Sequence, residues 1–175
     1  MFVSMGELVR AVGLRGELKF LPDGDYLASV MQSRYLRRRR GQDPSRVIAI
    51  EHSRVQGETL VIKFFGVDDR EGAEAMVGES IGFLAEDYDR PDFPRPAEPH
   101  PFVYHGLRVE LTGGELVGEV EGVMVLPANL VLQVRAEGGR EHLIPVIPPV
   151  VKSLDREGGR LVIEAMPGLL SEEDE

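Results

Sequence analysis

The 175-residue sequence predicts a mainly β protein made of two small β-barrels joined by a proline-rich linker, with one short helix in the first barrel. Three observations lead to this prediction. Short runs of β-branched and aromatic residues alternate with glycine-containing turns in both halves. One stretch, residues 86–101, is dense in proline and separates the halves. One segment, residues 68–78, spaces its apolar residues as a helix does.

The first half, residues 1–88, is expected to form one domain. Several short strands separated by turns are typical of a small antiparallel barrel. The first two strands meet at Gly13-Leu14-Arg15-Gly16, where the two glycines permit positive φ angles. Residues 26–33 are compatible with either a helix or irregular structure. The expected strands are residues 7–11, 17–21, 35–40, 47–55, 60–65 and 80–84.

A short helix is expected after Gly66. Asp68 stands at the N-cap position and Glu71 follows three residues later, so the two side chains would form a capping box. The apolar residues that follow have helical spacing, and Gly78 would supply a left-handed stop. The sequence therefore predicts one capped helix between two strands.

The proline-rich stretch predicts a stiff linker over residues 89–101, because proline lacks the backbone donor of a sheet and favours extended backbone. A second domain is expected over residues 102–170, followed by an acidic tail, 171–175, that frays. Glycine-containing turns again separate short strands, which indicates a second barrel. These expected strands are residues 107–111, 115–125, 130–135, 141–146 and 160–165.

Composition and charge restrict the possible functions. The chain has no cysteine, which excludes disulfides, thiolate metal sites and cysteine nucleophiles. No apolar run approaches the roughly 18 residues of a membrane helix, and the first residues have no basic leader, so we expect a cytoplasmic protein without a membrane partner. Of the net charge of −10, residues 1–84 contribute nothing, with 12 acidic and 12 basic side chains. The acidic second half suits a basic protein partner, although acidic surfaces also simply keep small domains soluble.

An arginine run is the strongest electrostatic feature of the first half. Alternate residues of a strand point to opposite faces, so at most half of the run would line one groove unless the strand lies at a sheet edge. Two interpretations stay open: contact with RNA phosphates, or charges that prevent edge-to-edge aggregation. Two further arginines, in the first hairpin, would extend the patch if the fold brings them near. The possible RNA contacts are Arg37, Arg38, Arg39, Arg40, Arg10 and Arg15.

The sequence offers little for catalysis. None of the four histidines has the spacing of helical metal ligands, and no glycine loop precedes a helix in the way that phosphate binding requires. Turn and capping roles explain Asp68 and Asp69 better than a pair of catalytic acids does. We therefore expect a protein that is not an enzyme and has no metal and no cofactor.

Three blocks of the sequence carry a family resemblance. They are Gly6–Arg10 with Gly13–Lys19, then Phe65–Gly78, then Leu143–Val146 with Val150, Val151 and Asp155 and the closing Pro167–Leu170. In this order along the chain, they resemble the RimM-type bacterial ribosome maturation factors. The chain departs from the family at Ala11 and Val12, where relatives usually carry Pro-His, and at Asn129, where an aspartate is common. The segment Phe102–Leu107 is also shorter and lacks the family's aspartate.

The resemblance implies a first barrel like that of translation factors and a second barrel of the PRC type. It also implies a non-enzymatic assembly factor that binds the immature small ribosomal subunit. We expect the protein to be a monomer. Binding would use a basic protein of the subunit's head and nearby ribosomal RNA, and would promote head maturation and processing of that RNA. On this resemblance, the partner contacts are Phe102, Tyr104, His105, Asn129 and Pro145. We expect Tyr104 to be partly exposed; the alternative is that one or both of these aromatic side chains plug the end of the second barrel.

Two other functions stay open from the residues alone. One is direct RNA binding through the basic first barrel. The other is hydrolysis by His105 or His142 with nearby carboxylates. Salt dependence separates RNA binding from protein binding, because affinity that rests on phosphate contacts falls steeply as salt rises.

Overall fold

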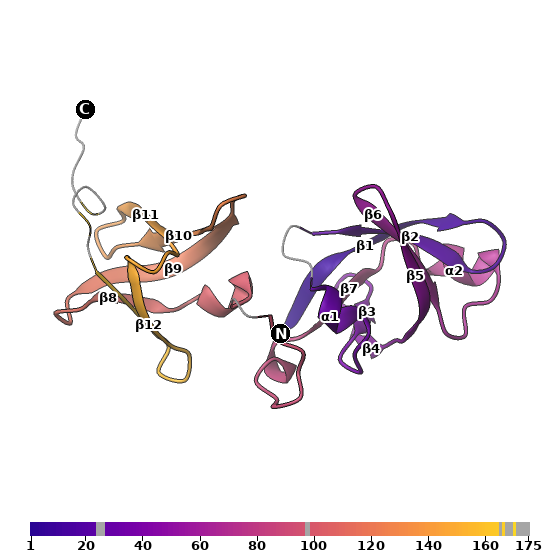
Figure 1. The fold of residues 1–175 in the computed structure, drawn as a ribbon, viewed down its shortest axis with the longest axis horizontal. Coiled ribbons are helices and arrows are strands. Elements are labelled where there is room, and N and C mark those ends of the chain that lie inside the picture. Colours follow the sequence, from indigo (N-terminus) through magenta and orange to yellow (C-terminus); the bar gives the residue numbers. More distant parts are fainter. Residues whose placement is uncertain (24–26, 97–98, 165, 167–169, 171–175) are drawn as a thin grey trace. The chain divides into compact units, whose positions relative to one another are not determined.

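The computed structural model describes residues 1–23, 27–96, 99–164, 166 and 170 (Figure 1). The chain forms two compact units, Met1–Pro99 and His100–Glu175. Both are built mainly from strands, so the mainly β, two-part fold class is confirmed. The acidic tail, residues 171–175, lies outside the described residues.

The first unit contains one seven-stranded sheet in the order β4-β3-β7-β1-β2-β6-β5, and all of its strand pairs are antiparallel. The sheet curves around the core of the unit, and both β1 and β5 contain register shifts that bend them. The strands are β1 Phe2–Val12, β2 Glu17–Pro22, β3 Arg37–Arg39, β4 Arg46–Val47, β5 Ile50–Gln56, β6 Thr59–Phe64 and β7 Ser80–Leu84.

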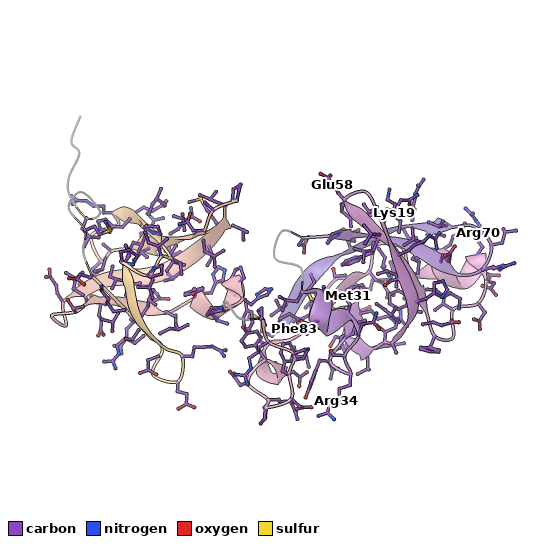
Figure 2. The ribbon with its side chains drawn as sticks, viewed as in Figure 1. Lys19, Met31, Arg34, Glu58, Arg70 and Phe83 are labelled. Atoms are coloured by element: carbon purple, nitrogen blue, oxygen red, sulfur yellow. The ribbon has the colours of Figure 1, made fainter. Side chains whose placement is uncertain are left out.

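Large apolar side chains on the inner face of the sheet make the core of the first unit. Met31 and Phe83 are buried in this unit, whereas Figure 2 shows Glu58 and Arg70 at its periphery. Met31 belongs to a four-residue helix, α1 (Ala28–Met31), within the stretch for which the sequence left two possibilities. The fully buried large side chains of this core are Phe20, Phe64, Phe83, Met5, Leu8, Leu18, Leu36, Ile62 and Ile81.

One expected strand is interrupted in the structure. The sequence predicts a single strand over residues 47–55, but β4 ends at Val47 and β5 begins at Ile50. Between them the Ile48 amide donates to the Leu36 carbonyl, beside β3, and the Ala49 carbonyl accepts from the Phe65 amide, beyond β6. The chain therefore leaves one edge of the sheet and joins the other within two residues.

The expected helix exists, but its N-cap is Asp69, whereas the sequence predicts Asp68. Helix α2 spans Arg70–Met76, and the Asp69 side chain accepts the hydrogen bond from the Gly72 amide at 2.7 Å. Asp68 instead accepts from Lys63 Nζ at 2.8 Å. Lys63 is buried on β6, just before the turn, so its ammonium group binds the Asp68 carboxylate and leaves Asp69 to begin the helix. Gly78 has a φ of 80°, as a left-handed stop requires.

The first part of the expected linker packs against the first unit. After the short 3-10 helix η1 (Ala85–Asp87), the Phe93 ring lies 5.1–5.2 Å from the rings of Tyr35, Phe83 and Tyr88. The Tyr35 hydroxyl donates to Asp92 at 2.6 Å. Residues 89–96 therefore fold as part of the first unit, beyond the boundary at residue 88 that the sequence predicts.

The second unit contains one six-stranded sheet in the order β11-β10-β9-β8-β13-β12. The sequence did not predict β12, which follows two prolines and is short and mostly polar. It also did not predict that β13 pairs with β8 in parallel. A 3-10 helix, η2 (Pro101–Tyr104), precedes β8 and packs on β9. The strands are β8 Arg108–Leu111, β9 Leu116–Val125, β10 Leu130–Arg135, β11 Glu141–Pro145, β12 Val151–Asp155 and β13 Arg160–Ile163.

Candidate functional site

The arginine run forms strand β3, and its members have different partners. Arg38 Nη1 donates to both carboxylate oxygens of Glu79, at 2.8 and 2.7 Å. Arg37 turns towards the buried Asp87, with 3.8 Å between its Nε and the carboxylate. The Arg39 guanidinium lies 4.4 Å from the centre of the Phe2 ring. The alternation expected of a strand is therefore present.

Arg40 ends the run and is tied to the connection between α2 and β7. Its Nη2 donates to the carbonyl oxygens of Ala75 and Val77, at 2.6 and 3.2 Å, and lies 3.6 Å from Glu79. Glu79 is buried, with 6% of its surface exposed. A single buried carboxylate thus holds the guanidinium groups of Arg38 and Arg40 close together.

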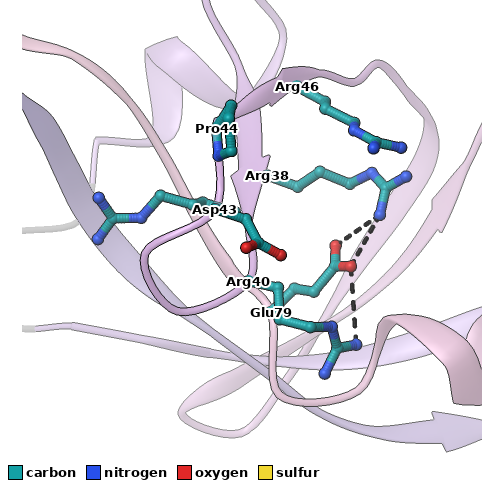
Figure 3. A pocket seen from close by; sticks show the side chains of 7 residues that line it. Arg38, Arg40, Asp43, Pro44, Arg46 and Glu79 are labelled. Atoms are coloured by element: carbon teal, nitrogen blue, oxygen red, sulfur yellow. Dashed lines mark hydrogen bonds and ion pairs between the residues drawn. The ribbon is translucent and has the colours of Figure 1, made fainter.

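These arginines line a basic pocket of about 410 Å³, which we call the arginine pocket (Figure 3). The sequence did not point to Arg46, on β4, which enters the pocket because β3 and β4 pair with Arg38 opposite Arg46. The signal that would have found it is the turn at Gly41–Ser45, which makes residues 37–47 a hairpin. The lining residues are Arg38, Arg39, Arg40, Asp43, Pro44, Arg46 and Glu79.

Arg10 and Arg15 are exposed and are not among the residues that line the arginine pocket. Arg10 lies on β1, directly opposite Lys19. Arg15 lies at the tip of the β1–β2 hairpin, where the Gly13 carbonyl accepts from Arg70 Nη1 at 3.3 Å. The structure therefore brings Arg38, Arg39 and Arg40 together and leaves the two hairpin arginines outside that group.

The second unit presents a mixed apolar and acidic surface on β9, β10 and β11, which we call the β9–β11 face. Leu132, Val134 and Ile144 point to the core with no exposed surface, so the residues that alternate with them point outward. Three cross-strand rows result on the outward side. They are Met124–Val131–Pro145, then Gly122–Gln133–Leu143, then Glu119–Arg135–Glu141.

The β9–β11 face changes from apolar to charged along the strands. Leu143 is 51% exposed in the middle row, and Val125 and Leu126 are exposed just beyond the apolar row. At the charged end, Arg135 Nε lies 3.0 Å from Glu121 and its Nη2 lies 3.5 Å from Glu141. An apolar centre beside a charged rim is the usual composition of a protein–protein interface.

An acidic pocket of about 340 Å³ adjoins the charged row. Gly118 lets the neighbouring backbone come close at this point, because a Cβ atom at this position would overlap the carbonyl oxygen of Arg135. The three glutamates of this pocket outnumber its two arginines, so the pocket suits a basic side chain of a partner. The lining residues are Arg108, Leu116, Gly118, Glu119, Glu121, Arg135, Ala136 and Glu137.

The residues expected to contact the partner near η2 differ in how deeply they are buried. Tyr104 is only 3% exposed, so the expectation that it is partly exposed is wrong. It ends η2 and packs inward with Val103 because that short helix lies against β9. Phe102 is half-buried, with the Arg156 guanidinium 6.0 Å from its ring centre, and its amide donates to His100 Nδ1 at 3.3 Å. His105 is exposed just after η2.

Asn129 and Pro145 lie at the same end of the β9–β11 face. Pro145 is half-buried opposite Val131, and Asn129 closes the β9–β10 turn by accepting from the Leu126 amide at 3.1 Å. Pro145 contributes to the apolar row, and Asn129 is one residue from β10. The sequence could indicate these positions but not the exposed Leu143 between the apolar and charged rows, because the outward direction depends on the strand register.

The histidines are not assembled into a metal site. Within residues 1–23, 27–96, 99–164, 166 and 170, no group of three or more histidine and carboxylate side chains is placed to hold a metal ion. In the same part of the chain, no helix is long and apolar enough to cross a membrane.

Comparison with known proteins identifies both units. Residues 3–88 match the family model described as the RimM N-terminal domain, and residues 102–169 match the RimM PRC barrel domain. The ribosome maturation factor RimM of Synechococcus sp. (strain CC9605) is 33% identical over 173 residues, which cover 97% of this chain and 96% of that protein.

Two further relatives cover nearly the whole chain. The ribosome maturation factor RimM of Anaeromyxobacter sp. (strain Fw109-5) is 34% identical over 170 residues, covering 96% of this chain and 98% of that protein. A crystal structure from Pseudomonas aeruginosa, described as a 16S ribosomal RNA processing protein RimM, is 27% identical with a TM-score of 0.45, and the match covers 95% of this chain and 99% of that one. Because two family models together span most of the sequence and relatives above 30% identity align end to end, the chain belongs to the RimM family of ribosome maturation factors.

Proposed function

We propose that this protein assists maturation of the small ribosomal subunit by binding a basic protein of the subunit's head with its second unit. It acts as a monomeric binding protein in the cytoplasm, without catalysis, and promotes head maturation and processing of small-subunit RNA. Membership of the RimM family supports the assembly role. The mixed apolar and acidic composition of the β9–β11 face supports its choice as the docking surface.

Charge supports a basic partner for this surface. Residues 100–175 contain 13 acidic and 6 basic side chains, whereas residues 1–99 contain 17 and 14. Such a field raises the rate of encounter with a basic protein more than it raises the final affinity. The acidic pocket would then receive a lysine or arginine side chain, while Leu143 and the apolar row exclude water from the contact beside it.

The expected contact residues have different parts in this proposal. Pro145 and Asn129 border the apolar row and would touch the partner. Phe102 and His105 form a second candidate group beside η2. Tyr104 supports the fold of η2 from inside, so a contact with the partner would be indirect.

The test compares two exposed apolar residues on different units. Leu143→Asp would place a carboxylate in the middle row of the β9–β11 face, and Val55→Asp would place one on β5 of the first unit, where Val55 is 78% exposed. Both proteins are added to cell extract that lacks the native protein, and their sedimentation with free small subunits is measured. Leu143→Asp should weaken this association about ten-fold or more, as expected when a charge replaces an apolar interface residue.

Val55→Asp should sediment as the unchanged protein does, and both variants should keep their melting temperature, because both side chains are mostly exposed. Co-sedimentation that is equally strong for Leu143→Asp and the unchanged chain would refute the β9–β11 face as the docking surface. Absence of the unchanged protein from the small-subunit fractions at low salt would refute the assembly role itself.

A further inference from the structure

Two arginines face each other across strands β3 and β4. The antiparallel register places Arg38 directly opposite Arg46, and Figure 3 shows the two side chains extending side by side in the same direction. Like charges placed directly opposite each other destabilise a strand pair. The arrangement therefore costs folding stability, and an anion bound between the two guanidinium groups would remove that cost.

Glu79 aligns the arginines but does not neutralise the pocket. Its one carboxylate is shared between Arg38 and Arg40, whose remaining N–H groups stay available as donors. Asp43 also lines the pocket, so its four arginines and two carboxylates leave an excess of two positive charges. This excess lies on a protein whose net charge is −10. The pocket is thus a local basic site on an acidic molecule.

The other two arginines of the pocket, Arg39 and Arg46, also have unused hydrogen-bonding capacity. Within the described part of the chain, Arg46 has no ion-pair or hydrogen-bond partner for its side chain, and the buried Nε of Arg39 has no acceptor. A guanidinium group with free donors binds phosphate oxygens in a two-pronged manner, which a lysine cannot do. The pocket can therefore supply several such donors to one ligand.

We propose that the arginine pocket binds phosphate groups of the RNA backbone, in single-stranded ribosomal RNA. The lining contains no aromatic side chain on which a base would stack, so the contacts are made to phosphates and are independent of base sequence. A volume of about 410 Å³ admits a phosphate with its attached sugar. This inference rests on the proposed function, because RNA is the polyanion that a factor bound to a ribosomal subunit meets.

The test measures binding of a fluorescently labelled 12-nucleotide oligouridine to the full chain at several salt concentrations. Arg46→Ala is the test variant, because it removes the arginine without an internal partner. Arg54→Ala is the matched control: Arg54 is an exposed arginine on β5 that pairs with Glu17 outside the pocket. Arg46→Ala should weaken binding about ten-fold, the usual effect of removing a charge-assisted hydrogen bond. The slope of log affinity against log salt should become shallower by about 0.7 for each phosphate that the variant no longer neutralises.

A second readout separates binding from structural support. Arg46→Ala should keep or raise the melting temperature, because it removes the repulsion with Arg38, whereas a merely structural role would lower it. Inorganic phosphate should raise the melting temperature of the unchanged chain more than chloride does at equal ionic strength. The Arg46→Ala protein should lose that difference.

Three outcomes would overturn the inference. Equal losses of oligouridine affinity in Arg46→Ala and Arg54→Ala would assign the effect to overall charge. Unchanged affinity in Arg46→Ala would remove the pocket from the binding surface. Displacement of oligouridine by a poly-glutamate peptide at matched charge concentration would identify the pocket as a site for acidic protein segments. Because the oligouridine assay contains no ribosomal subunits, its results are independent of the Leu143→Asp experiment. Either proposal can therefore fail alone.

Discussion

Gly16 and Val67 lie so close together that a Cβ atom on Gly16 would overlap the Val67 carbonyl oxygen. Gly16 closes the tip of the β1–β2 hairpin, and Val67 lies in the turn that precedes α2. Arg70, the first residue of α2, holds the same hairpin by donating to the Gly13 carbonyl at 3.3 Å. The β1–β2 hairpin and the turn before α2, which are distant in sequence, therefore pack against each other. Leu14 projects from this contact with 76% of its surface exposed.

We predict that Gly16→Ala lowers the free energy of unfolding by about 2–5 kcal/mol. The left-handed backbone conformation destabilises an alanine by about 1–2 kcal/mol, and overpacking against a backbone carbonyl adds about 1–3 kcal/mol. Gly13→Ala is the control, because Gly13 also has a positive φ, 63°, but its nearest neighbour would be the tip of Glu17 at 3.9 Å. Urea denaturation should show the smaller loss for Gly13→Ala. Equal losses for the two variants would contradict the close contact with Val67.

The cap of α2 gives a second prediction. Asp69→Ala should lower the free energy of unfolding by about 0.5–2 kcal/mol, because the Gly72 amide loses its acceptor. Asp69→Ser should recover most of this loss, since serine is an equally good N-cap. Thermal or urea denaturation of the three proteins measures both effects. A serine variant as unstable as the alanine variant would show that Asp69 acts by another route than capping.

The sequence could locate α2 but could not choose between its two aspartates. Gly66, the apolar spacing and Gly78 are local signals, and they place the helix correctly. The cap depends on Lys63, which is buried and bound to both Asp68 and Glu51, at 2.8 and 3.0 Å. Its pKa is raised above the usual value, first by Asp68 and then by Glu51. That arrangement requires β5 and β6 to pair, which local sequence does not reveal.

The same limit explains the rest of what the sequence missed. The turns at 112–114 and 136–139 predict two hairpins of the second unit, and both are present. Strand β12 carries too weak an alternation to be recognised without its partner β13. Arg46 reaches the arginine pocket, and Leu143 reaches solvent, only through strand register. Composition indicated which charges matter, but the pairing of strands decided which of them meet.

The burial of Tyr104 gives a third prediction. Tyr104→Ala should lower the free energy of unfolding by about 3 kcal/mol, as expected when a large aromatic side chain leaves a core. His105→Ala, one residue further and exposed, should change it by no more than about 0.5 kcal/mol. Chemical denaturation compares the two. A stable Tyr104→Ala protein with reduced small-subunit binding would contradict this prediction and indicate that Tyr104 contacts the partner directly.

The Asp92 carboxylate should titrate below its usual range. The hydrogen bond from the Tyr35 hydroxyl is the main cause that lowers its pKa, and the backbone and the nearby Arg34 add to it. A carboxyl group with a lowered pKa in the folded state contributes stability above its unfolded pKa of about 3.9. That contribution is lost as pH falls through the folded value. NMR titration of the Asp92 carboxyl should therefore give a midpoint below about 3.9, and Tyr35→Phe should move it upward. An unchanged midpoint in Tyr35→Phe would exclude the hydroxyl as the cause.

The packing of Phe93 extends the first unit beyond residue 88. Its side chain is 4% exposed and lies within 5.2 Å, between ring centres, of Tyr35, Phe83 and Tyr88. Phe93→Ala should therefore destabilise the first unit by about 3–5 kcal/mol. Phe65→Ala is the control, because Phe65 is 64% exposed and should change stability by at most about 0.5 kcal/mol.

The same aromatic packing predicts how fragments of the chain behave. A fragment of residues 1–96 keeps Phe93, Asp92 and the Ser29 hydroxyl bond to the Pro94 carbonyl, at 2.9 Å, whereas a fragment of residues 1–88 lacks all three. Fragment 1–96 should unfold in one transition at a clearly higher urea concentration than fragment 1–88. Equal midpoints would mean that residues 89–96 only rest on the surface, and the boundary would then lie near residue 88. A shift of the midpoint by Phe93→Ala in fragment 1–96, but not by Phe65→Ala, would assign the difference to the aromatic cluster.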